Sequence, residues 1–267
     1  MKLSIGGFSF FNTLLEGKMD IFGYLETVKY RYRLDAVDLW NGLYGTADDQ
    51  DGLLRIWDED RIRKIRDALD ERQLNVANIA IDGAHLIDKD PVRREKLYHN
   101  ALANLRASEI LGAKTVRIDF CSSDTEEIGE QDFDYIVHRY REFCERAAQH
   151  GYKIGPENHM GAALNPHLHR RIAEAVDHPN YGILLHLKRW KPEYPDGDAV
   201  VAPWVVHTHV DAKTAVSEEV HSSIEALRKS GFDGYWAVEY NAAVNQYTEI
   251  EWLLATVKKL LGSTAKA

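Results

Sequence analysis

The sequence alternates between two kinds of segment over nearly its whole length. Short apolar segments rich in β-branched and aromatic residues recur eight times, and longer segments with helical spacing lie between them. The short segments are residues 2–7, 35–40, 74–81, 114–120, 153–158, 181–187, 204–210 and 235–240. Because alternating strands and helices build parallel sheets, eight such units in 267 residues predict an α/β fold, a single-domain (β/α)8 barrel or TIM barrel.

The helical segments carry end signals that support this division. Residues 90–112 place Asp90 as a candidate N-cap, Pro91 at the first helical position and a glycine just past the end. The segment 132–151 also stops at a glycine, and 217–231 begins with Ser217 and acidic residues and ends with basic ones, which complements the helix dipole. An open doubly wound sheet is the alternative, but "GGFSFFN" after the first strand lacks a glycine-rich phosphate fingerprint. We predict a barrel over residues 1–262 and a frayed tail over 263–267.

Composition argues against several classes of partner. The net charge is −9, whereas nucleic-acid binding usually requires a basic face. No apolar run approaches the roughly 18 residues of a membrane helix, and the N-terminus lacks a signal-peptide pattern. Only Cys121 and Cys144 are present, too few for a disulfide framework. We expect a cytoplasmic protein that acts on a small neutral or weakly charged molecule, without nucleic-acid or membrane partners. The sequence allows either a monomer or a homo-oligomer.

Polar residues end the last four predicted strands. Glu157 ends the fifth, His186 the sixth, His207 and His209 lie near the end of the seventh, and Glu239 lies near the end of the eighth. The carboxyl ends of barrel strands meet at one mouth, and adjacent strands are about 4.8 Å apart, so inward side chains could meet around one ion. Each residue alone could be a hydrogen-bonded structural group. Together they favour a shared metal site, because unpaired buried carboxylates are strongly penalised.

Other polar residues near the strand ends are candidates to bind the substrate. Arg117 and Asp119 share a strand face, so an internal ion pair is the alternative for that arginine. Basic groups after strands six and seven could bind a carboxylate or phosphate. The substrate-binding candidates are Trp40, Asn41, His85, Arg117, Asn158, His159, Lys188, Arg189, His207, Asp211, Lys213 and Asn241.

Three short motifs resemble a known group of barrels. "PENH" (156–159), H-x-H (207–209) and "VEY" (238–240) are similar to motifs of the xylose isomerase-like TIM-barrel superfamily, the sugar phosphate isomerase/epimerase family. Members include sugar isomerases and epimerases, inosose and dehydroshikimate dehydratases, and endonuclease IV DNA-repair enzymes. The resemblance covers nearly the whole chain in length and strand order. It implies one divalent ion held by Glu157, His186, His209 and Glu239, with Glu157 and Glu239 also catalytic.

The chain departs from the family pattern after strand six. His186 stands where the family usually has aspartate, and Arg189 stands where it often has histidine. His85 corresponds only loosely to a histidine after strand three, and "MGAALN" (160–165) lacks a substrate-binding glutamate. Two glutamates and two histidines make a neutral site around a divalent ion, and imidazole favours manganese, cobalt, iron or zinc over magnesium. The alternative is that His186 turns away and the metal site is weakened or lost.

The resemblance implies a metal-dependent isomerase or epimerase for a sugar or a sugar-like polyol or keto acid. Such an enzyme removes a proton next to a carbonyl and passes through an enediolate. A dehydratase or lyase acting on a related cyclic polyol or keto-sugar is one alternative, and a non-catalytic sugar-binding barrel is another. DNA cleavage of the endonuclease IV kind is disfavoured, because the chain is acidic and the first half offers too few ligands.

Overall fold

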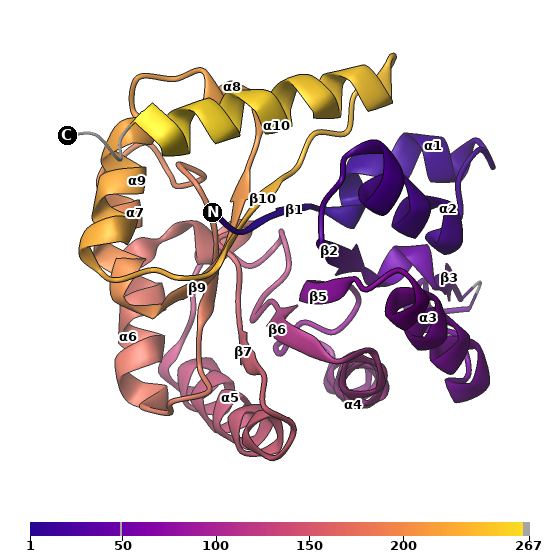
Figure 1. Ribbon diagram of the computed structural model, residues 1–267. Coiled ribbons are helices and arrows are strands. Elements are labelled where there is room, and N and C mark those ends of the chain that lie inside the picture. The colour runs from indigo at the N-terminus through magenta and orange to yellow at the C-terminus, as the bar shows by residue number, and fades with distance from the viewer. Residues whose placement is uncertain (49, 264–267) are drawn as a thin grey trace.

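Eight parallel strands form a closed ring in the computed structural model, which describes residues 1–48 and 50–263 (Figure 1). One arc has the order β1-β10-β9-β8 and the other β2-β5-β6-β7. Isolated bridges between Gly6 and Asp38 and between Glu157 and Leu184 join the arcs at both seams. The strands are β1 (Leu3–Ile5), β2 (Ala36–Trp40), β5 (Asn75–Ile81), β6 (Ala113–Ile118), β7 (Lys153–Gly155), β8 (Ile183–His186), β9 (Val205–Val210) and β10 (Tyr235–Val238). The predicted TIM barrel is confirmed.

Helices follow the strands and surround the ring (Figure 1). They are α1 (Phe11–Leu15), α2 (Ile21–Glu26), α3 (Glu59–Glu71), α4 (Pro91–Leu111), α5 (Glu130–His150), α6 (Pro166–Val176), α7 (Gly197–Val201), α8 (Ala212–Ala215), α9 (Val220–Lys229) and α10 (Gln246–Ser263). A hairpin of β3 (Gly45–Ala47) and β4 (Leu54–Ile56) lies between β2 and α3 and was not predicted. Its strands have three residues each and are partly exposed, so they carry no apolar pattern.

The end signals of the sequence are borne out in α4 and at the end of α9, where Arg228 and Lys229 lie in the last turn, but they fail at the start of α9. The Asp90 carboxylate accepts a hydrogen bond from the Val92 amide, and Gly112 adopts a left-handed conformation with φ 72°. The prediction that Ser217 begins a helix is wrong, because α9 starts at Val220. The amide and hydroxyl of Ser217 both donate to the carbonyl of Thr214, so this serine closes the turn after α8.

Helix α10 continues through Ser263, one residue into the predicted tail. The rest of that tail, residues 264–267, lies outside the described residues. Cys121 and Cys144 are both buried and free. Among the residues that the structure describes, no helix is long and apolar enough to cross a membrane.

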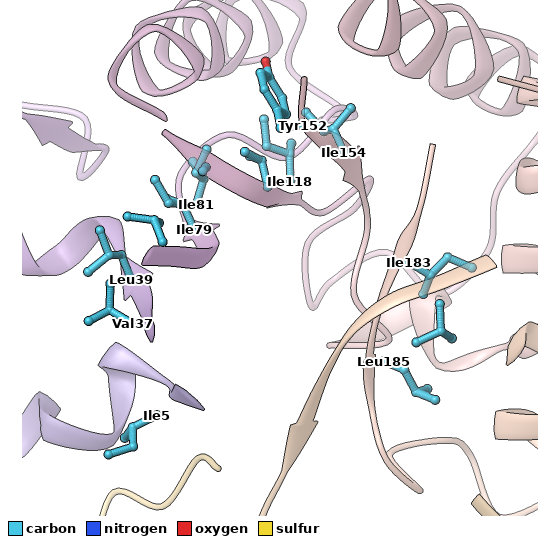
Figure 2. Packing of buried hydrophobic residues seen from close by; sticks show 14 of the residues in the cluster. Ile5, Val37, Leu39, Ile79, Ile81, Ile118, Tyr152, Ile154, Ile183 and Leu185 are labelled. Carbon is cyan, nitrogen blue, oxygen red and sulfur yellow. The ribbon is translucent and has the colours of Figure 1, made fainter. Parts of the chain in front are cut away.

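Alternation along the strands separates an apolar layer from a polar interior. Leu39, Ile81 and Leu185 are buried and point away from the barrel interior towards the helices (Figure 2). Side chains of the opposite parity face inward. Asp38 of β2 accepts a hydrogen bond from His207 of β9 across 2.7 Å, although β1 and β10 separate these strands in the ring. The helix-facing layer therefore supplies the hydrophobic burial, and the interior is left to polar chemistry.

Barrel closure at the seam between β7 and β8 requires a glycine. A Cβ atom on Gly155 would lie 1.9 Å from the carbonyl oxygen of Gly182, and neither backbone can retreat without breaking the seam. We expect Gly155→Ala to reduce the free energy of unfolding by about 2–4 kcal/mol, measured by urea denaturation. Gly262→Ala is the matched control, because a Cβ there meets nothing within 4 Å, and it should be neutral or slightly stabilising. Equal stability of the two variants would contradict the expectation.

Candidate metal centre

The four predicted ligands lie at the carboxyl ends of four neighbouring strands. Glu157 follows β7, His186 ends β8, His209 lies in β9 and Glu239 follows β10. His209 is the register partner of both His186 on one side and Ala237 on the other, so the strands present their ends at one level. This register brings the imidazoles of His186 and His209 to the same side of the mouth, with ring centroids 5.9 Å apart.

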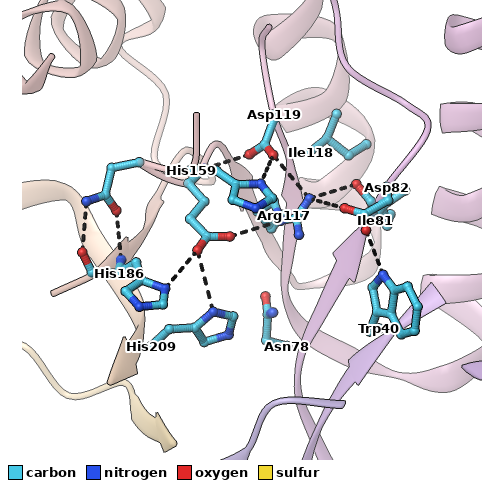
Figure 3. Close-up of polar contacts among 12 residues, drawn as sticks. Trp40, Asn78, Ile81, Asp82, Arg117, Ile118, Asp119, His159, His186 and His209 are labelled. Atoms are coloured by element: carbon cyan, nitrogen blue, oxygen red, sulfur yellow. Dashed lines mark hydrogen bonds and ion pairs between the residues drawn. The ribbon is translucent and has the colours of Figure 1, made fainter. Parts of the chain in front are cut away.

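Both imidazoles point toward the same carboxylate (Figure 3). His186 Nδ1 lies 3.3 Å from Glu157 Oε1 and 3.6 Å from Glu239 Oε2. His209 Nδ1 lies 3.6 Å from Glu157 Oε1 and 3.7 Å from Glu239 Oε2. Each of the two imidazole nitrogens therefore lies 3.3–3.7 Å from an oxygen of both glutamates, and His186 does not turn away from them.

These separations fit a small divalent cation. Nitrogen and oxygen ligands about 2.0–2.1 Å from a tetrahedral metal lie about 3.3–3.4 Å from one another. Of the four nitrogen–oxygen distances, one equals this ligand–ligand distance at 3.3 Å, and the other three, 3.6, 3.6 and 3.7 Å, are slightly longer. Glu157, His186 and His209 are buried and offer ligand atoms within 4.8 Å of one another. The group could hold a metal ion after small side-chain adjustments.

The orientation of His209 leaves one nitrogen free for such an ion. Its Nε2 donates to Asp38 Oδ2 over 2.8 Å, which leaves Nδ1 with a lone pair directed at the glutamates. This Nδ1 is buried and has no hydrogen-bond partner. A buried unpaired nitrogen is costly in a finished structure, so its position favours a ligand at that point.

The ionisation of the cluster also calls for a positive charge. Burial alone would lower the pKa of His209, but the charges of Glu239 and Asp38 raise it well above its ordinary value. Burial would raise the pKa of Glu157, yet His159, His186 and His209 hold it well below its usual range. The cluster therefore attracts a proton onto a buried imidazole, and a divalent cation can supply the same charge.

His186 is oriented by a carboxylate of its own. Its Nε2 lies 3.2 Å from Asp211 Oδ2, while the other oxygen of Asp211 caps α8 by accepting from the Thr214 amide. Arg189 Nη2, which can only donate, also lies 3.2 Å from this Nε2, so Nδ1 faces Glu157 with a free lone pair only in the tautomer whose Nε2 proton goes to Asp211. Both candidate histidine ligands thus have a carboxylate within 3.2 Å of the ring nitrogen that faces away from Glu157.

Two arginines adjoin the same glutamate. Arg117 Nε lies 3.3 Å from Glu157 Oε2, and the Arg117 guanidinium also pairs with Asp82 at 2.8 Å and Asp119 at 3.2 Å (Figure 3). Burial opposes its charge, but these carboxylates raise the pKa of Arg117 above its ordinary value. Arg189 Nη1 lies 3.3 Å from Glu157 Oε1. The internal ion pair considered for Arg117 and Asp119 is present, within a larger network.

A cavity of about 90 Å³ opens beside three of the four groups, Glu157, His209 and Glu239. Its wall contains both arginines and aromatic rings, and Trp40 is fixed there by donation from Nε1 to Asp82 over 2.7 Å. The lining includes Phe8, Trp40, Arg117, His159, Arg189 and Glu239. A larger cavity of about 750 Å³ lies at the opposite end of the barrel, next to Lys2, Lys114 and Lys153, away from the candidate ligands. Only the smaller cavity adjoins the candidate ligands.

The structure does not bring every predicted substrate-binding residue to this cavity. Asn41 is buried, and its amide bonds to the backbone of Asp82 and to Asn104. Asn158 is also buried, accepting from the His186 amide and donating to the carbonyls of His186 and Arg189. These two asparagines hold loops in place. The other predicted residues outside the cavity lining are His85, Lys188, His207, Asp211, Lys213 and Asn241.

Several of these outlying residues have structural partners instead. His85 lies 3.7 Å from Asp88, and burial lowers its pKa. The Lys188 ammonium donates to the Pro195 carbonyl and the Ser222 hydroxyl, and Lys213 is exposed on α8. Asn241 accepts from the Asn12 amide.

Sequence reasoning missed two residues of the site, Asp38 and Asp82. Asp38 is buried and accepts from His207, His209 and Asn78, while Asp82 binds Arg117 and Trp40. A signal existed for Asp38, because an aspartate in the middle of the apolar segment 35–40 needs a buried partner. Asp82 directly follows the predicted strand 74–81, so the strand-end criterion applied to Glu157 and Glu239 could also have found it.

A closed ring of parallel strands with polar groups at their carboxyl ends is the architecture of a TIM barrel with its candidate active site in the usual place. The chain belongs to the xylose isomerase-like TIM barrel family, whose model matches residues 41–256. No curated protein sequence matches the chain.

Solved structures with the same fold share little sequence with this chain. D-psicose 3-epimerase with D-tagatose, from Clostridium cellulolyticum, superposes with a TM-score of 0.74 at 14% identity, covering 98% of this chain and 99% of that one. The IolI protein with a zinc atom gives 0.76 at 12% identity and coverage of 98% and 99%. A probable 3-DHS dehydratase, AsbF from Bacillus anthracis, gives 0.67 at 17% identity and coverage of 97% and 98%. At these identities the likeness establishes the fold.

Asp38 should be needed to hold His209 in its metal-binding orientation. In Asp38→Asn, the new NH2 group must replace one of the two acceptor oxygens. It then faces the donating Asn78 amide or the donating histidine nitrogens, and the second clash is relieved only if a histidine changes tautomer. We expect the affinity for manganese or zinc, measured by titration calorimetry, to fall about 10–100-fold. Asp20→Asn is the control, since asparagine also caps helices and Asp20 caps α2 far from the site. Unchanged metal affinity in Asp38→Asn would refute this role.

Proposed function

We propose that this protein is a divalent-metal-dependent isomerase or epimerase of a sugar, polyol or keto acid. The observation that carries the proposal is the convergence of the Glu157 and Glu239 carboxylates with two imidazole nitrogens at the barrel mouth. The names of two structural neighbours, a sugar 3-epimerase and a protein with bound zinc, support it. Glu157, His186, His209 and Glu239 would hold the metal, which would stabilise negative charge on substrate oxygens.

Glu239 is the better placed of the two glutamates to take a proton from carbon. Its side chain is 17% exposed and lines the cavity, whereas that of Glu157 is 2% exposed. Glu157 also lies 3.3 Å from both Arg117 and Arg189, and these two contacts leave its oxygens less free to accept a proton from carbon. We assign removal of the proton next to the carbonyl to Glu239. Proton return on the other side falls to Glu157, which must first take a proton from water or a substrate hydroxyl, because its lowered pKa leaves it ionised.

The surrounding residues would bind the substrate and limit water. Trp40 and Phe8, with ring centroids 5.2 Å apart, form an apolar wall of the cavity, against which the carbon face of a sugar could pack. Asp82 and Asp119 hold Arg117 beside Glu157, so that its charge stays at a fixed place near the reacting atoms.

A dehydratase is the second candidate, and His159 is the residue that favours it. This histidine lines the cavity and lies 2.9 Å from Asp119 through Nδ1. Burial would lower its pKa, but Glu157 and Asp119 raise it, so the ring can hold a proton for a leaving hydroxyl. Both reactions begin with the same proton removal, and the products separate them.

Removing the carboxylate of Glu239 should abolish proton removal. With saturating manganese, we expect Glu239→Gln to lower kcat about 10²–10⁴-fold, because the amide cannot accept the proton. The measurement is deuterium incorporation next to the carbonyl, followed by NMR in heavy water across a panel of ketoses and keto acids. Glu225→Gln, an exposed glutamate paired with Lys229 on α9, should react like the parent protein. Full exchange in Glu239→Gln would remove this residue from the mechanism.

The two histidines should make the site selective among metals. We expect the protein to bind manganese, cobalt or zinc at least about 10-fold more tightly than magnesium, because imidazole suits the transition metals better. Titration calorimetry of chelator-treated protein measures the affinities, and elemental analysis of protein purified without chelator identifies the native ion. Equal affinity for magnesium, or full activity with magnesium alone, would contradict the assignment of His186 as a ligand.

A further inference from the structure

Arg189 contacts three of the four groups that could bind the metal. Its Nη1 lies 3.3 Å from Glu157 Oε1, and its Nη2 lies 3.2 Å from His186 Nε2 and 3.9 Å from Glu239 Oε2. The side chain is 33% exposed and forms part of the cavity wall. A guanidinium thus neutralises the same carboxylate oxygens that face the two imidazole nitrogens.

The backbone of this arginine is held firmly, while the end of its side chain reaches the cavity. Lys188, the preceding residue, has a left-handed conformation with φ 60°, and its amide donates to the buried carboxylate of Asp198. The Asn158 amide donates to the carbonyl of Arg189. These contacts fix the backbone so that the Arg189 side chain lies in the wall of the cavity.

A metal ion and the guanidinium compete for one oxygen. Coordination through Glu157 Oε1 uses the lone pairs that Arg189 Nη1 now contacts, and a divalent ion beside a guanidinium repels it. The neighbouring acids have other partners, since Asp211 binds His186 and Thr214 while Asp82 and Asp119 bind Arg117. With metal bound, Glu157 and Glu239 would be shared with the ion, and the guanidinium would face the cavity with less of their charge to balance it.

We propose that the site takes a sugar-like molecule that carries an oxyanion, a carboxylate or a phosphate, and that Arg189 binds this group. The inference rests on the proposed function and adds the class of substrate to it. Two parallel hydrogen bonds from a planar guanidinium match either oxyanion. The anion lies between the arginine and the metal side of the cavity and relieves their repulsion, while the polyol part of the molecule faces Trp40 and Glu239. A neutral sugar leaves the repulsion in place.

The test compares ligands that differ only at one carbon. D-Glucose, D-glucuronate and D-glucose 6-phosphate, and the matching galactose and mannose series, are titrated calorimetrically into the manganese-loaded protein. We expect at least one anionic member of a series to bind 10-fold or more tightly than its neutral sugar, and the tighter of the two anions tells carboxylate from phosphate. Arg189→Gln should remove the preference. Arg170→Gln, an exposed arginine paired with Glu174 on α6, should keep it. Equal or undetectable binding of all members, or a preference that survives in Arg189→Gln, overturns the proposal.

Metal titrations test the competition directly. Arg189→Gln should bind manganese several-fold more tightly than the parent protein when no sugar is present, and the anion preference should vanish in chelator-treated parent protein, because the two binding events are linked. Weaker or unchanged manganese binding by Arg189→Gln contradicts the competition. Catalysis and sugar binding by the parent protein separate the two hypotheses. An anion preference without any catalysis contradicts the proposed function alone. Catalysis without the preference contradicts only the role of Arg189.

Discussion

The hydrogen bonds that Asp38 accepts from His207 and His209 are the contacts on which the polar interior of this barrel depends. They connect β2 to β9 across the ring at 2.7 and 2.8 Å, and the other oxygen of Asp38 accepts from Asn78. Burial raises the pKa of Asp38, but the two histidines lower it well below its ordinary value, so the carboxylate stays charged. An ionised carboxylate inside a barrel is tolerated only because donors surround it.

The same requirement, that each buried charge have a partner, extends to the mouth. Glu157 lies among Arg117, Arg189 and two imidazoles, and Arg117 in turn is balanced by Asp82 and Asp119. Positive groups therefore already occupy much of the space around the glutamate before any metal or substrate arrives. In this setting an imidazole at position 186 and a guanidinium at position 189 add no negative charge beside Glu157.

The eight strands and the main helices could be predicted because their signals are local. Apolar alternation marks the strands, and residues such as Asp90 and Gly112 mark helix ends whatever the rest of the chain does. Parity and strand order also predicted that Glu157, His186, His209 and Glu239 point to one place. The failures have a common origin: Ser217 closes the preceding turn, Asn41 and Asn158 hold loops, and Asp82 meets Arg117 from another strand. The partner in each case is set by packing, and the residue type alone does not reveal it.

The sequence by itself determined the barrel, its order of strands and the level at which the four candidate ligands end their strands, because each follows from periodicity and chain order. Only the tertiary structure decided which nitrogen of each histidine faces the glutamates, since Asp38 and Asp211 come from other elements and choose it by hydrogen bonding. The place of Arg189 is likewise a tertiary matter. Its distance to Glu157 depends on a left-handed turn at Lys188 that Asp198 and Asn158 stabilise from separate loops, and no pattern along the chain encodes such a meeting.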